Sequence, residues 1–134
     1  SDVYKRQEEG VASRERFLGQ LPHETLIDVY NAADALVLAS TREGWPNVLL
    51  EAMACGTPTI SSNVSSLPEV VGQAGLTHDP NDWQMLTRHI AQLLGDPTAR
   101  KHFKRAGLEQ SARFSWDRAA RETQNVYDEV VGGQ

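Results

Sequence analysis

The stretch TREGWPNVLLEAMACGTP, from Thr41 to Pro58, determines how the rest of this chain can be arranged. Pro46 fixes a φ angle close to the helical value, and its missing N–H costs nothing in the first turn of a helix. The eight residues after Asn47 contain no helix breaker, and the Gly-Thr-Pro sequence that follows is a common helix end. The pattern predicts a helix beginning near Asn47, with N-terminal amides that attract an anion.

Two carboxylates flank the start of this expected helix. Glu43 precedes it in a turn with Gly44, and Glu51 lies one turn inside it, four residues after Asn47 and on the same face. Because helical side chains lean toward the N-terminus, Glu51 is expected to point back toward Glu43. A carboxylate that accepts two hydrogen bonds suits a vicinal diol, such as the 2′ and 3′ hydroxyls of a ribose. Phosphate-binding amides beside such an acid form a site suited to a nucleotide.

A purely structural interpretation of the same residues stays open at this point. The helix dipole alone favours Glu in the first turns of a helix, by about 0.3–1 kcal/mol. The spacing of the two acids does not separate this interpretation from a nucleotide site.

The segments around this helix predict an α/β fold. A helix is expected from Pro22 to Asp34, with Leu26, Ile27, Tyr30 and Ala33 on one face, and short apolar runs on either side of the central helix are typical of strands in a parallel sheet. This alternation indicates a Rossmann-like doubly wound parallel sheet, in which ligands bind beyond the carboxyl ends of the strands. Ser40 to Glu43 occupy such a position. Four strands are expected. The first lies within residues 11–18 and ends at Phe17–Leu18, and the others cover residues 35–39, 57–61 and 75–79.

The remainder of the chain is expected to be helical. A short helix enters through Pro68, and an amphipathic helix covers 82–94 with Trp83, Leu86, Ile90 and Leu93 on one stripe. Asp96 and Pro97 begin the next helix, and Ser115 caps the last one. That last helix carries Trp116, Ala119, Ala120, Thr123 and Tyr127, and its aromatic side chains are assigned to the core. Three segments result: a flexible or artefactual tail over 1–10, a partial Rossmann-like domain over 11–114, and a C-terminal helix over 115–134.

The composition excludes several classes of protein. With 134 residues the chain fits one domain, and its net charge of −5 argues against a nucleic-acid-binding surface. No apolar run approaches the length of a membrane span. Cys55 is the single cysteine, which excludes a disulfide framework and favours a small core thiol, and the four histidines match no metal-ligand spacing.

The string STREGWPNVLLEAMACGTPTISSNVSSLPEVVG, Ser40 to Gly72, resembles the C-terminal domain of retaining glycosyltransferases of the GT-B fold, in particular glycosyltransferase family 4. The hallmark of that family is a Glu, seven residues and a second Glu, which here are Glu43 and Glu51. The resemblance is specific over residues 34–76 and looser from Phe17 to about Tyr127.

The resemblance implies transfer of a hexose from a nucleoside diphosphate sugar to an acceptor, with the anomeric configuration retained. It implies that Glu51 holds the ribose, and that Glu43 contacts the transferred sugar and stabilises positive charge at its anomeric carbon. Backbone amides after Glu43 would cradle the sugar and the diphosphate; because Pro46 has no N–H, these donors would come mainly from Asn47 and Val48. Glu69 is a secondary candidate for the same cleft, and neither a metal nor another cofactor is expected. The donor-binding set is Glu43, Gly44, Trp45, Asn47, Val48, Leu49 and Glu51.

A GT-B enzyme has two Rossmann-like domains, and the N-terminal one binds most of the acceptor. The resemblance therefore implies that this chain is an incomplete, cytoplasmic fragment that is inactive alone, binds a UDP or GDP sugar, and leaves any peripheral membrane association to the absent domain. Three alternatives share its features: a nucleotide-sugar epimerase or phosphorylase of the same fold, a non-catalytic nucleotide-binding partner subunit, and an incomplete gene product without independent function.

Overall fold

The computed structural model describes residues 10–132, and its centre is a parallel sheet of three strands in the order β1-β2-β3. Leu36 pairs with Thr59, and Ile60 pairs with Leu76, which places the buried strand β2 between its two neighbours. The three strands coincide with three of the short apolar runs, as the sequence predicts. Their bounds are β1 (Leu36–Leu38), β2 (Thr59–Ser62) and β3 (Leu76–His78).

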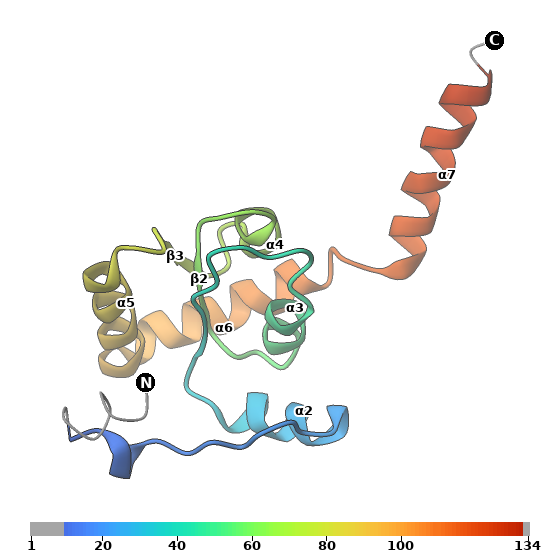
Figure 1. Cartoon of the computed structure of the whole chain (residues 1–134). Coiled ribbons are helices and arrows are strands. Elements are labelled where there is room, and N and C mark those ends of the chain that lie inside the picture. The colour runs from blue at the N-terminus through green and yellow to red at the C-terminus, as the bar shows by residue number, and fades with distance from the viewer. Residues whose placement is uncertain (1–9, 133–134) are drawn as a thin grey trace.

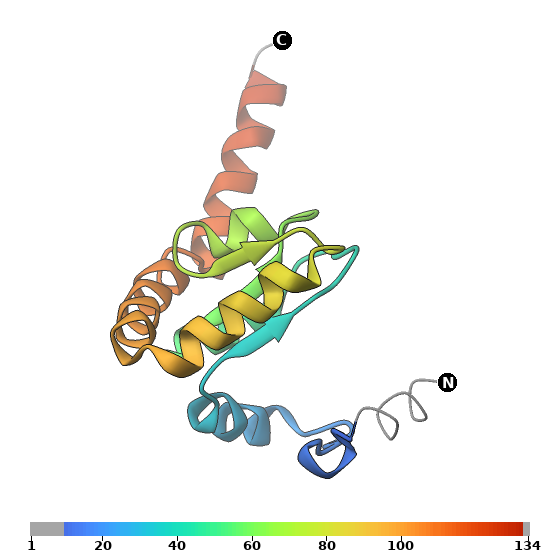
Figure 2. The same ribbon diagram turned by 90° about the vertical axis from the view of Figure 1, so that its left-hand side faces the viewer.

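Helices cover both faces of this sheet (Figures 1 and 2). Helices α3 (Asn47–Ala54) and α4 (Leu67–Val71) lie on one face, and α5 (Trp83–Gly95) lies on the other. Helix α6 (Pro97–Ser111) packs against both α3 and α5, while α2 (His23–Ala32) packs on α3. The arrangement confirms the predicted α/β class with a parallel, Rossmann-like sheet.

The core lies between the sheet and the helices α3 and α4. It forms because these helices place their apolar side chains on one stripe, facing a strand that is buried along its whole length. Helix α3 stops where the sequence predicts: Gly56 takes a left-handed φ of +73°, its N–H donates to Met53 O, and Cys55 at the helix end is half-buried. The buried cluster is Leu49, Met53, Leu67, Val70, Val71 and Ala74.

The prediction of a strand that ends at Phe17–Leu18 is wrong. A single 3-10 turn, η1 (Ala12–Arg14), occupies part of that segment, and the Phe17 side chain is 76% exposed. A strand is stable only when a neighbour satisfies its backbone groups, and no described strand pairs with this segment. Gly19, directly after this segment, has a left-handed φ of +65°, and the chain bends at Gln20.

The core role predicted for the aromatic residues of the last helix is also wrong. Helix α7 (Trp116–Gly132) projects away from the sheet and its covering helices (Figure 1), and none of its residues is buried. Trp116 is 90% exposed. An amphipathic stripe shows that a helix has an apolar face, but it does not say which surface covers that face. Within residues 10–132, no helix is long and apolar enough to cross a membrane.

Candidate functional site

Glu43 lies at the carboxyl edge of the sheet, in the loop that follows β1. The Ser40 hydroxyl donates to Glu43 Oε2 at 3.1 Å, and the Glu43 backbone N–H donates to Ser65 Oγ at 3.3 Å. The backbone and one carboxylate oxygen of this half-buried residue are therefore both held, whereas Oε1 has no partner among the described residues. This geometry presents one fixed carboxylate oxygen at the edge where α/β sheets bind ligands.

Three serines, Ser62 at the end of β2 and Ser65 and Ser66 just before α4, hold this loop in place. In addition to the contact from Ser65, the Ser62 hydroxyl donates to Ser40 O and the Ser66 hydroxyl donates to Gly44 O. Ser65 has a left-handed φ of +54°, a conformation that is uncommon for a residue other than glycine and is often found near functional sites. The sequence predictions missed this role, although a serine-rich run directly after a central strand is a signal that could have revealed it.

The start of α3 narrows the set of amides that can meet a ligand. Buried Pro46 is the N-cap residue, the Asn47 N–H donates to Trp45 O at 3.0 Å, and the Leu49 N–H donates to Pro46 O at 3.0 Å. Among the described residues, the Val48 N–H has no partner. Of the two amides expected to bind a diphosphate, that of Val48 is open, whereas that of Asn47 is already used within the loop.

Glu51 lies one turn further along α3 and contacts α2. The buried Tyr30 hydroxyl donates to Glu51 Oε2 at 3.1 Å. Burial, followed by the hydrogen bond and the negative charge of Glu51, raises the pKa of Tyr30 to about 12. The phenol therefore remains a hydrogen-bond donor throughout the physiological pH range.

Two adjoining cavities run along the face of α3 that carries Asn47, Leu50, Glu51 and Ala54. The larger has a volume of about 810 Å³, and the smaller, of about 440 Å³, contains Glu51; Leu50 and Phe114 line both. Glu43 lines neither, so the two acids lie on the same loop–helix unit without sharing one of these cavities. The larger cavity brings the predicted residues Trp45, Asn47 and Glu69 together.

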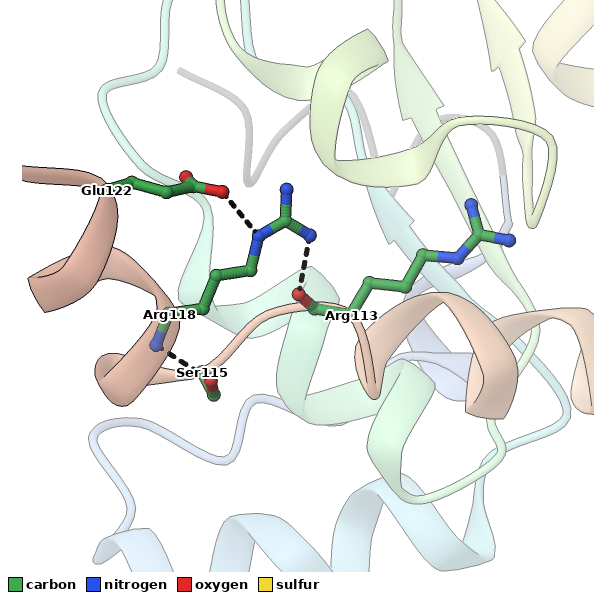
Figure 3. A network of polar contacts seen from close by, with 4 residues as sticks. All are labelled: Arg113, Ser115, Arg118 and Glu122. Atoms are coloured by element: carbon green, nitrogen blue, oxygen red, sulfur yellow. Dashed lines mark hydrogen bonds and ion pairs between the residues drawn. The ribbon is translucent and has the colours of Figure 1, made fainter. Parts of the chain in front are cut away.

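The junction between α6 and α7 forms the other wall of the larger cavity. Phe114 packs edge-on against Trp45, with ring centroids 5.8 Å apart. Arg118 links the start of α7 to the segment after α6 (Figure 3). Its Nε donates to Glu122 Oε1 at 2.7 Å, and its Nη1 donates to Arg113 O at 3.1 Å. The Arg118 N–H donates to Ser115 Oγ at 3.1 Å, which confirms the predicted cap. Sequence patterns did not reveal this wall, because its residues lie about 65 positions from the central helix.

Comparison with known proteins decides the family. The sequence pattern of the family described as "Glycosyl transferases group 1" matches residues 3–110. The chain belongs to this family. Among the residues that the structure describes, no three His, Cys, Asp or Glu side chains are grouped as metal ligands.

Relatives in the glycosyltransferase family extend the match over most of the chain. The O-antigen chain mannosyltransferase B of Escherichia coli is 46% identical over 112 residues, covering 84% of this chain and 29% of that protein. A D-inositol 3-phosphate glycosyltransferase of Corynebacterium diphtheriae is 38% identical over 124 residues, covering 91% of this chain and 29% of that protein. The chain thus spans less than a third of the length of these curated relatives.

A solved glycosyltransferase-family structure has the same fold. The sucrose-phosphate synthase of Thermosynechococcus elongatus superposes with a TM-score of 0.84 at 32% identity, over 99% of this chain and 34% of that one. The resemblance to a GT-B glycosyltransferase domain drawn from the sequence is confirmed.

Proposed function

We propose that this chain is the donor-binding part of a retaining glycosyltransferase that transfers a hexose from a nucleoside diphosphate sugar, with UDP or GDP as the nucleotide. One observation carries the proposal: the two family acids lie on one loop–helix unit at the carboxyl edge of the sheet, Glu43 clamped by serines and Glu51 one turn inside α3. The E. coli and C. diphtheriae relatives, both named as glycosyl-transferring enzymes, support the reaction class.

The chemistry follows from the charge that develops during transfer. As the bond to the diphosphate breaks, the anomeric carbon gains positive charge and the leaving oxygen gains negative charge. Glu43, whose Oε1 is open, stabilises the first, and the open Val48 N–H at the start of α3 stabilises the second. Glu51 binds the ribose hydroxyls, and no metal ion takes part in the proposed reaction. The acceptor is bound mainly by a further, N-terminal domain, and the enzyme acts in the cytoplasm.

Nucleotide binding to the 134-residue chain tests the donor site directly. Amide NMR spectra are recorded during titration with UDP, GDP and ADP, for wild type and for Glu51→Ala. We expect shifts around Gly44 to Glu51 with one nucleotide, and a loss of about 1–3 kcal/mol in binding free energy for Glu51→Ala when the ribose hydrogen bonds are removed. Glu109→Ala is the matched control, because that acid lies exposed on α6 and pairs with Arg105. Equal affinities of wild type and Glu51→Ala would refute the ribose assignment.

Glu43 is tested in a longer parent protein that carries the acceptor domain. Glu43→Ala is expected to leave nucleotide affinity unchanged and to lower kcat by at least about a hundredfold, since a fixed charge at the reacting carbon is lost. NMR assignment of the anomeric configuration of donor and product tests retention. An inverted product would refute it, and release of a sugar isomer without an acceptor would favour the epimerase alternative.

A further inference from the structure

The contact between Tyr30 and Glu51 joins α2 to the candidate nucleotide site. Tyr30 is 5% exposed and belongs to the last turn of α2. Its backbone is fixed independently of its hydroxyl, because Thr57 Oγ1 donates to Tyr30 O at 2.6 Å and the Ala33 N–H donates to the same carbonyl at 3.2 Å. The phenol therefore projects from a rigid position toward a half-buried carboxylate.

The hydroxyl is not required for packing. A phenylalanine at position 30 would fill almost the same volume, so what the oxygen adds is a directed hydrogen bond to Glu51 Oε2. A glutamate side chain has three rotatable bonds, and holding it in one rotamer costs conformational entropy. When Tyr30 fixes Oε2 in the free protein, that ordering is complete before a ligand arrives.

We propose that Tyr30 is a positioning residue for the nucleotide: its hydroxyl holds Glu51 Oε2, so that Glu51 Oε1 accepts the hydrogen bond from a ribose hydroxyl. This inference rests on the proposed function and adds the group that orients the ribose-binding acid. It also specifies the contact, since Oε2 is already shared with the phenol and Oε1 has no partner among the described residues.

The test measures the dissociation constants of UDP, GDP and ADP for the 134-residue chain by NMR titration, and continues with the nucleotide that wild type binds. Tyr30→Phe is expected to weaken that nucleotide about three- to tenfold, the range of one modest hydrogen bond. Tyr127→Phe is the matched control: it removes the same phenol oxygen from an exposed position on α7 that lines neither cavity, and it should leave the dissociation constant unchanged.

A double-mutant cycle separates positioning from a general effect on the fold. In the Glu51→Ala background, Tyr30→Phe is expected to have no further effect on the dissociation constant, because there is no carboxylate left to orient. A loss that persists in that background would overturn the inference, as would equal affinities of wild type and Tyr30→Phe. A folded wild-type chain that binds none of the three nucleotides would instead refute the proposed function, and the inference with it.

Discussion

At the scale of single residues, Tyr30 links the site to the pH dependence of stability. The unfolded chain loses the Tyr30 proton near the ordinary pKa of 10.0, whereas the folded chain retains it to about 12. The stabilisation is thus complete below pH 10 and is lost as the pH rises through about 12. Between pH 9 and 11, the free energy of unfolding of wild type should fall by about 1 kcal/mol more than that of Tyr30→Phe. Urea titrations at both pH values measure this, and equal falls would contradict the burial of the phenol.

Gly75 allows the chain to approach β2 closely just before β3. A Cβ at this position would lie 2.5 Å from Thr59 Oγ1 and 2.8 Å from the Thr59 carbonyl oxygen. Because a backbone atom cannot move aside cheaply, Gly75→Ala should lower the free energy of unfolding by about 1–3 kcal/mol. Gly95→Ala is the control. A Cβ added at Gly95 would meet no atom within 4 Å, and alanine favours the helix, so the free energy of unfolding should stay equal or rise slightly. Urea midpoints of both variants distinguish the two cases.

At the scale of secondary-structure elements, Asp96 fixes the junction between α5 and α6. Its Oδ1 accepts from the Thr98 N–H at 2.8 Å and the Ala99 N–H at 3.1 Å, while Arg100 Nη1 donates to Leu93 O at 2.6 Å at the end of α5. Asp96→Ala should therefore reduce the free energy of unfolding by about 0.5–2 kcal/mol. Asp96→Asn keeps an oxygen acceptor and should therefore retain most of the stabilisation that the cap provides. Thermal unfolding of the three proteins measures the difference, and an Asn variant as unstable as the Ala variant would contradict the capping role.

Elements with strong local signals could be predicted from the sequence. The apolar run around Val37 is too short for a helix and became β1, and Pro46 with Gly56 bounds α3 as expected. Local rules fix such elements because proline and glycine restrict the backbone wherever they occur. The strand predicted around Phe17 did not form, because a strand depends on a neighbour that sequence patterns do not identify.

The candidate site divides in the same way. Glu43 and Glu51 could be named because their spacing along one loop and helix is a local pattern. Tyr30 and Ser65 could not, since each reaches the acids from a segment 21 or 22 residues away in the chain. Contacts of this kind depend on how parallel strands and helices are stacked, which is a property of the tertiary fold.

At the scale of the whole molecule, the site is built from segments that are far apart in the sequence. The sheet edge supplies Glu43, the β2–α4 segment clamps it, and α2 contacts Glu51. The segment between α6 and α7 contributes Phe114, which packs on Trp45 and lines the cavity beside α3. Mutations that loosen the packing of α6 on α3 should therefore alter the cavity without touching either acid.

Helix α7 gives the sharpest prediction about the molecule as a unit. None of its residues is buried, and its apolar side chains, Tyr127 and Val130 among them, are exposed. Stability follows the apolar area removed from water. The free energy of unfolding of a chain that ends at Ser115 should therefore lie within about 0.5 kcal/mol of that of the full chain. Its far-UV circular dichroism should lose the signal of the 17 helical residues of α7. Leu93→Ala, at a fully buried position, calibrates the assay with an expected loss of about 2–5 kcal/mol. A truncated chain destabilised by more than about 1 kcal/mol would mean that α7 packs on the domain in solution.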